Sequence, residues 1–161
     1  MTQSGAVTSF PSIGRWSVTA MPANWIYVAG FGIKQMIAAY GQIAASVGVG
    51  EDTLEAEDGL PAYLEKQMKM IEGSLQDVKC AGPKPTSFPG ADEAHLMFVR
   101  HTLESTGQML HAQTYARVGL WVGIVTLTTL ESQLSVVRAD YDAFVRGLHI
   151  GPAGADVVAG S

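Results

Sequence analysis

Two histidines, His101 and His111, are the residues whose type and spacing come closest to a chemical site. They lie in two segments rich in β-forming residues, 94–103 and 109–118, and the polar residues between these segments include a glycine. This pattern predicts a β-hairpin. With the turn centred on Thr106, the two imidazoles face each other across the hairpin, close enough to share a metal ion. A zinc site needs further ligands, and no Asp, Glu or Cys lies at a spacing that supplies them, so we predict no metal site.

Other catalytic patterns are missing from the sequence. Cys80 lies in a segment with three prolines and no neighbouring histidine, and no serine lies in a G-x-S-x-G turn. The glycines of 29–35 and 47–52 do not continue into a phosphate-binding motif. The acidic run 51–58 lacks the spacing of a calcium loop. We therefore expect a protein that is not an enzyme and that has no cofactor.

The composition narrows the classes of partner and compartment. A net charge of -5 and a pI near 5.2 argue against binding to nucleic acid or to an anionic membrane. The single cysteine fits a reducing compartment, and the sequence shows neither a signal peptide nor the roughly 18 consecutive apolar residues of a membrane span. We therefore expect a cytoplasmic protein without direct membrane insertion. Hydrophobic residues make up 47% and charged residues only 16%, so part of the apolar surface is expected to face a partner.

The pattern of elements predicts an α+β fold. Helical spacing of apolar residues predicts two main helices, at about 60–75 and about 133–148. Alternating or β-rich segments predict about six strands in a mainly antiparallel sheet: 15–21, about 26–31, about 42–49, 94–103, 109–118 and 120–130. Between them we expect an irregular connection after residue 31 and a loop or edge strand at 78–89. We expect one domain at 13–150, between a disordered arm at 1–12 and a disordered tail at 151–161.

The two-residue period of a strand sorts the hairpin side chains onto two faces. One face carries Leu96, Phe98, Arg100, Leu110, Ala112, Thr114 and Ala116. The other carries Met97, Val99, His101, Leu103, Met109, His111, Gln113 and Tyr115. The second face mixes large apolar groups with a glutamine and two histidines, which is typical neither of a core nor of a solvated surface.

Several segments resemble a known family. They are W-x-V-x-A-M-P-x-x-W at 16–25, ASVGVGEDTL at 45–54, LPAYLEKQMKMIEGSL at 60–75, and then ADEAHLMFV, LHAQTYARVG and WVGIVTLT. This succession, from about residue 16 to 150, is similar to the DcrB-like and PsbP-like α/β proteins. Within them it looks most like the Eag-type chaperones of type VI secretion effectors.

The resemblance implies a function as well as a sandwich fold. It implies a cytoplasmic homodimeric chaperone whose sheet face shields the N-terminal apolar helices of an effector until secretion. Polar side chains in that family complement the apolar groove, and the corresponding positions here are Ser46, Gln67 and Gln113. Together with the hairpin face, this predicts a partner-binding surface of Ser46, Gln67, Val99, Met109, Gln113 and Tyr115. The alternative is a structural component of a secretion or phage-like assembly that uses the same fold as a packing module.

Overall fold

A seven-stranded antiparallel sheet, in the order β3-β4-β5-β9-β8-β7-β6, forms the centre of the computed structural model. The structure describes residues 12–23, 25–29, 34–40, 43–55, 59–75, 77–103 and 107–152. The strands of this sheet are β3 (Trp25–Ala29), β4 (Lys34–Tyr40), β5 (Ile43–Thr53), β6 (Lys79–Thr86), β7 (Glu93–Leu103), β8 (Gly107–Val118) and β9 (Trp121–Leu130). The predicted arm and tail lie almost wholly outside the described residues.

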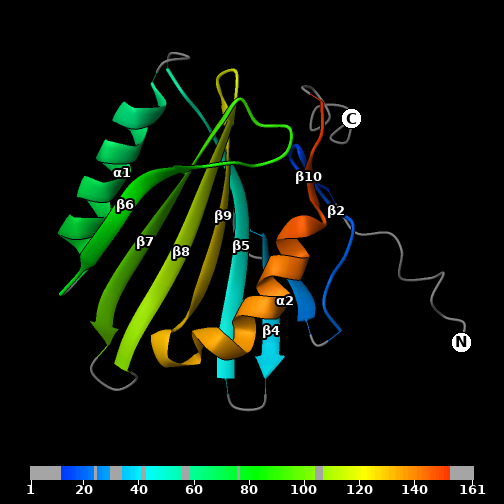
Figure 1. Cartoon of the computed structure of the whole chain (residues 1–161), viewed down its shortest axis with the longest axis vertical. Helices are drawn as coiled ribbons and strands as arrows, with labels where there is room; N and C mark the ends of the chain where they lie inside the picture. The colour runs from blue at the N-terminus through cyan, green and yellow to red at the C-terminus, as the bar shows by residue number, and fades with distance from the viewer. Residues whose placement is uncertain are drawn as a thin grey trace, which may run out of the picture.

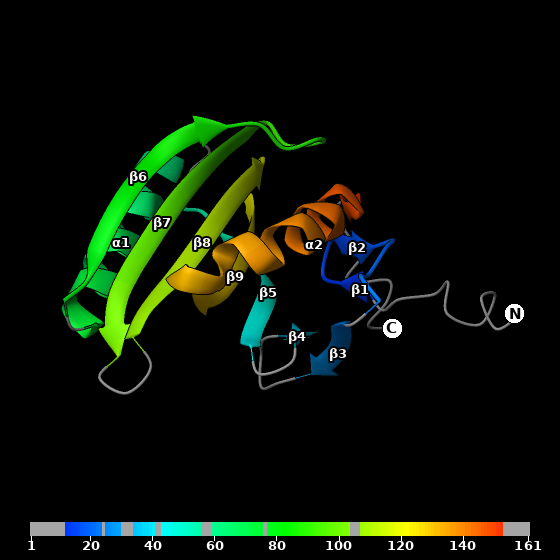
Figure 2. The ribbon, with the colours of Figure 1, turned by 60° about the horizontal axis from the view of Figure 1, so that its bottom comes forward.

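A second, three-stranded sheet and two helices complete the architecture. The small sheet has the order β1-β2-β10, with β1 (Ser12–Ile13), β2 (Trp16–Val18) and β10 (Leu148–Ile150). Helix α1 (Leu60–Ser74) and helix α2 (Leu134–Arg146, preceded by the 3-10 turn Glu131–Gln133) lie on opposite faces of the large sheet (Figures 1 and 2). Helix α1 runs behind β6 and β7, whereas α2 and the small sheet lie on the other side of the sheet (Figure 2). The predicted α+β class and both predicted helices are confirmed.

The strand prediction was wrong at one segment, and at a second segment the structure decides between the predicted loop and the predicted edge strand in favour of the edge strand. Strand β4 lies where we expected an irregular connection, because its backbone pairs with both β3 and β5 despite the glycines around it. Strand β6 forms in the proline-rich segment as the outer strand of the sheet, where one side of the backbone needs no partner. A register shift between Ala81 and Lys84 accommodates the prolines.

The register of the hairpin differs from the predicted one by two residues. His101 pairs with Met109, and His111 pairs with Val99, so the prediction that the two histidines lie directly opposite each other is wrong. The numbers of paired residues sum to 210, whereas a turn centred on Thr106 requires 212. A shift by an even number of residues preserves the alternation of faces, and the predicted division into two faces therefore holds.

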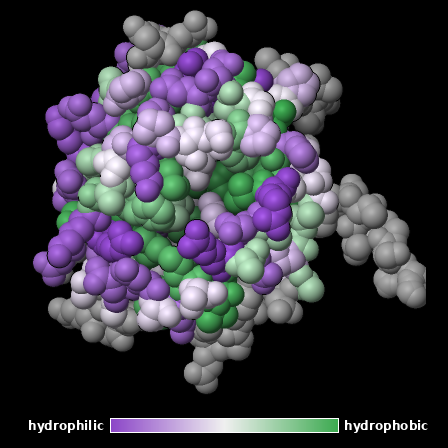
Figure 3. Space-filling model, viewed as in Figure 1, coloured by the Kyte–Doolittle hydropathy of each residue, from purple (hydrophilic) through white to green (hydrophobic). Residues whose placement is uncertain are grey.

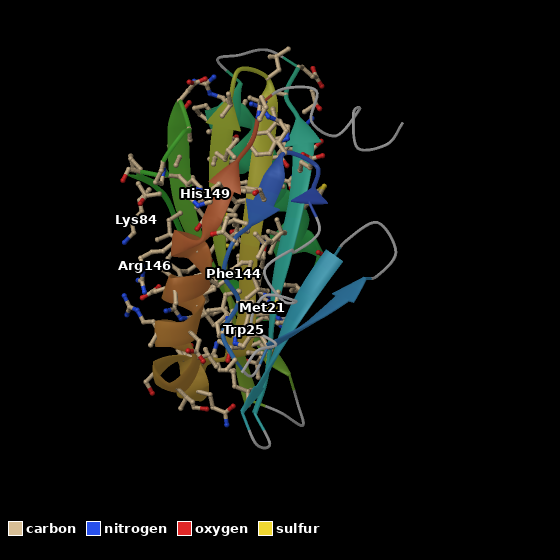
Figure 4. All side chains as sticks on the ribbon, turned by 90° about the vertical axis from the view of Figure 1, so that its right-hand side faces the viewer. Met21, Trp25, Lys84, Phe144, Arg146 and His149 are labelled. Atoms are coloured by element: carbon tan, nitrogen blue, oxygen red, sulfur yellow. The ribbon has the colours of Figure 1, made fainter. Side chains whose placement is uncertain are left out.

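Each face of the sheet has its own apolar core. On the α2 face, Trp25 contacts Phe144 with ring centroids 5.3 Å apart, and Met21 packs beside them (Figure 4). On the α1 face, the helix residues Leu60 and Leu64 are fully buried in one cluster with Met97. The cluster under α1 is separate from the cluster under α2. The position of α1 alone therefore decides which part of the sheet on its own side remains uncovered.

Candidate functional site

Burial on the α1 face falls from β7 towards β5. Met97 and Val99 on β7 are buried, with exposed fractions of 0% and 1%. Tyr115 on β8 and Val122 on β9 have the same orientation and are also buried, and Arg117 and Asp52 carry charges beyond them at one end of the face. The rest of this face on the next strands is a stretch of half-buried residues: Met109, His111 and Gln113 on β8, Ile124, Thr126, Thr128 and Leu130 on β9, and Ser46, Gly48 and Gly50 on β5. We call this set the open sheet face. Helix α1 covers the β6–β7 side of the sheet, and no helix of the described residues covers the open sheet face.

The open sheet face is organised in rows across three strands. Strand pairing places Ser46 next to Thr128 and Thr128 next to His111. The next row contains Gly48, Thr126 and Gln113. The side chains that β5 contributes to this face are small, because they come from glycine and serine. The hydroxyl groups of Thr126 and Thr128, the amide of Gln113 and the imidazole of His111 lie on the two neighbouring strands. None of the residues of this face is Asp, Glu, Lys or Arg, whereas Lys84 and Arg146 project from the α2 side (Figure 4).

The α2 side of the molecule has a different surface. Polar side chains are spread over it, with apolar atoms visible between them (Figure 3). On the three central strands, most side chains that point towards α2 are buried beneath that helix and the small sheet, among them Val47, Val125 and Leu127. The absence of charge is therefore a property of the open sheet face and not of the whole surface.

One flank of α1 borders the open sheet face. Tyr63 reaches from α1 to β5, where its hydroxyl donates a hydrogen bond of 2.9 Å to Asp52 Oδ2. Gln67 follows one helical turn later on the same flank and is half-buried. Tyr63, Gln67 and Asp52 line one open cavity of about 430 Å³ between α1 and the end of β5. Burial, and then the hydrogen bond to Asp52, raise the pKa of Tyr63, which therefore remains a neutral donor.

Gln113 has a fixed orientation within the floor. The Tyr115 hydroxyl donates to Gln113 Oε1 at 2.7 Å. Tyr115 itself is only 2% exposed and packs edge to face against Tyr63, and burial raises its pKa to about 12. Among the described residues, no hydrogen bond engages the Nε2 group of Gln113. The side-chain amide therefore has its donor group at the surface of the open sheet face.

The two histidines form a hydrogen-bonded pair at the other end of this face. Their Nε2 atoms are 2.9 Å apart, the ring planes differ by 3° and the ring centroids are 5.0 Å apart, so the rings meet edge to edge. His111 Nδ1 lies 2.9 Å from Thr128 Oγ1, which continues the chain onto β9. Burial, and then the charge on His101, lower the pKa of His111. Within the described ranges, no group of three or more His, Cys, Asp or Glu side chains could hold a metal ion.

The structure brings four of the six predicted partner-binding residues to one place. Ser46, Met109 and Gln113 lie on the open sheet face, and Gln67 lies on the flank of α1 that borders it. Val99 and Tyr115 are on the predicted face but are buried beneath α1, at 1% and 2% exposed. They support the floor and contribute almost no surface for a partner, which corrects the predicted surface.

The prediction missed the contribution of β9. Thr126 and Thr128 lie at the centre of the open sheet face, although the predicted partner-binding surface contains no residue of the segment 120–130. Its alternation of Thr with Val and Leu is a two-residue period that indicates one exposed and one buried face. The contact between Thr128 and His111 depends on the register between β8 and β9, and the alternation along β9 does not determine that register.

Neither a comparison of the sequence with protein families nor one with curated proteins finds a match. Solved structures are similar. One is the protein of unknown function PA94 from Pseudomonas aeruginosa, with a TM-score of 0.65, 19% identity, and coverage of 87% of this chain and 100% of that chain. Another is LpqN, involved in cell envelope biogenesis of Mycobacterium tuberculosis. It has a TM-score of 0.62 and 11% identity, and the match covers 89% of this chain and 87% of that chain.

The cyanobacterial PsbP (CyanoP) from Synechocystis has a TM-score of 0.54 and 10% identity, with coverage of 84% of this chain and 86% of that chain. The chain thus has a PsbP-like and DcrB-like α+β fold. In the part of the chain that the structure describes, neither helix has the length and hydrophobicity needed to cross a bilayer.

Proposed function

We propose that this protein is a non-enzymatic chaperone or adaptor that binds and shields apolar, transmembrane-type helices of a type VI secretion effector in the cytoplasm. The observation that carries the proposal is the open sheet face, an uncharged strip of half-buried residues beside α1. The resemblance to Eag-type chaperones supplies the class of partner and the expectation of a homodimer.

The dimensions of the open sheet face support a helix as the occupant. The open sheet face takes in three strands, whose two gaps amount to about 9.5 Å, and the sheet continues beyond β5 into β4 and β3. This width is close to the roughly 10 Å diameter of a helix with small side chains. From Ser46 to Gly50 the strand rises by about 13 Å, which equals the length of about nine helical residues.

The chemistry of the face supports an apolar helix of the membrane type. Such helices associate through close packing of small residues and through interhelical hydrogen bonds from hydroxyl and amide groups. The open sheet face offers small residues on β5 and the polar groups of Thr126, Thr128 and Gln113. Without charged residues in this strip, an apolar partner buries no unpaired ion.

The direct test is a substitution that fills the open sheet face without disturbing the core. A Cβ atom added at Gly50 meets no atom within 4 Å, so Gly50→Lys places a cation in open space beside Asp52. A Cβ added at Gly73, on α1, likewise meets nothing within 4 Å, which makes Gly73→Lys the matched control outside the face. Each variant is co-expressed with an effector's N-terminal apolar segment fused to a soluble carrier. Size-exclusion chromatography with light scattering then measures complex formation and stoichiometry.

We expect the wild type and Gly73→Lys to form a soluble complex with the segment, and Gly50→Lys to lose it. Two copies of the chaperone in the complex would support the homodimer. If the wild type and the fused segment elute separately, or if the fused segment stays in the pellet when it is co-expressed with the wild type, the chaperone function is excluded. If Gly50→Lys binds as well as Gly73→Lys, the partner uses a different surface.

A further inference from the structure

The chain His101–His111–Thr128 leads from a buried imidazole on β7 to the open sheet face. His101 is 7% exposed, whereas His111 and Thr128 are half-buried. The two contacts, Nε2 to Nε2 and Nδ1 to Oγ1, are both 2.9 Å long. The chain thus links a buried imidazole to a hydroxyl at the centre of the face.

Each contact in this chain holds one hydrogen, so the chain has two possible directions. In the outward direction, His101 Nε2–H donates to His111 Nε2, and His111 Nδ1–H donates to Thr128 Oγ1. The Thr128 hydroxyl hydrogen then remains for a group outside the protein. In the inward direction, Thr128 donates to His111 and presents only an oxygen lone pair. In the outward direction, Thr128 can donate a hydrogen bond to a partner. The Nε2 group of Gln113, in the next row, can do the same.

The two donors lie in neighbouring rows, and the spacing of these rows along the strands is close to the rise of one helical turn. Thr128 and Thr126 are two residues apart on β9, so the two rows are about 6.7 Å apart along the strands. Gln113 pairs with Thr126 from β8, so the second donor also lies one strand, about 4.8 Å, to the side. Residues four apart on an α-helix lie on the same side, with a rise of about 6.0 Å between them. A helix lying along the strands beside α1 therefore presents positions i and i+4 to the two rows.

We propose that the helix bound on the open sheet face carries oxygen-bearing side chains at positions i and i+4, one accepting a hydrogen bond from Thr128 and the other from Gln113. The inference rests on the proposed function and defines the class of partner more narrowly. Binding selects the outward direction of the histidine chain. His111 positions the Thr128 hydroxyl and does not contact the partner through its ring nitrogens.

The test compares three apolar helical peptides fused to a soluble carrier: one with serines at i and i+4, one with serines at i and i+2, and one with alanine throughout. Fluorescence anisotropy measures their dissociation constants. Two additional hydrogen bonds are expected to make the i, i+4 peptide bind about 5- to 150-fold tighter than the alanine peptide. Thr128→Val removes one of the two hydrogen bonds, so it should remove about half of the difference in binding free energy between the i, i+4 peptide and the alanine peptide. The dissociation constant of the alanine peptide should not change. Thr102→Val, at an exposed position on β7, is the control.

Nitrogen NMR of the imidazole rings gives a second measurement. In the complex with the i, i+4 peptide, His111 Nδ1 should be protonated and His111 Nε2 unprotonated. The same signals in the Thr128→Val complex should lose this preference. Equal affinities for all three peptides would refute the spacing rule and leave the chaperone function standing. No binding of any peptide to the wild type would refute both.

Discussion

The substitution Gly123→Ala tests how the α2 face of the sheet is packed. Gly123 lies on β9, and a Cβ atom there would overlap Trp16 Cζ2 and Trp121 Cη2, far inside van der Waals contact. Movement of either indole ring would break contacts that stabilise the fold. Trp16 is fully buried, contacts both Trp121 and Phe88 with ring centroids 5.4 Å apart, and donates from Nε1 to the Gly50 carbonyl at 2.9 Å.

The magnitude follows from these contacts. Overpacking of a buried site destabilises by about 1–3 kcal/mol, and weakening the Trp16 hydrogen bond adds about 0.5–1.5 kcal/mol. We therefore expect Gly123→Ala to lower the free energy of unfolding by about 2–4 kcal/mol. For a chain of this length, that corresponds to a melting temperature lower by roughly 5–15 °C.

The matched control is Gly50→Ala, on the neighbouring strand but on the opposite face. Its new methyl group meets nothing within 4 Å, so we expect an unchanged stability or a gain of up to about 1 kcal/mol from the reduced freedom of the unfolded chain. Urea unfolding followed by tryptophan fluorescence measures both variants. A Gly123→Ala protein within about 0.5 kcal/mol of the wild type would show that the packing of Trp16 against β9 is described incorrectly.

Two further predictions concern α1 and the histidine pair. Leu64 is 0% exposed under α1, so Leu64→Ala should lower the free energy of unfolding in urea by about 2–5 kcal/mol, whereas Leu120→Ala, at 41% exposed, should change it by less than about 0.5 kcal/mol. Burial lowers the pKa of His111 below its ordinary value of 6.5, so the unfolded chain takes up this proton more readily than the folded one. The corresponding stability is present above about pH 6.5 and is lost as the pH falls through the lowered folded pKa. Between pH 8 and pH 5, the melting temperature should therefore fall less for His111→Gln than for the wild type. His149 is exposed, so His149→Gln should behave as the wild type. If the melting temperatures of His111→Gln and the wild type fall equally, the lowered pKa of His111 is contradicted.

Periodicity in the sequence determined much of the fold. The helical spacing of Leu60 and Leu64 placed α1, because an amphipathic helix must bury one stripe. The alternation along β7 and β8 sorted their side chains correctly even though the register was wrong by two residues, since an even shift keeps each side chain on its face. The segment of β4, which has glycines before and after it in the sequence, and the proline-containing segment of β6 gave no such periodic signal, because pairing partners distant in sequence determine whether those segments become strands.

The candidate site divides in the same way. The sequence placed Gln113, Met109 and Val99 on one mixed face, because period-two alternation is a local property of a strand. Only the tertiary structure decided that Val99 is buried and Gln113 is open, since that depends on which strands α1 covers. It also decided that Thr128 meets His111, because this contact depends on the register between two strands, and a register is fixed by the packing of both faces.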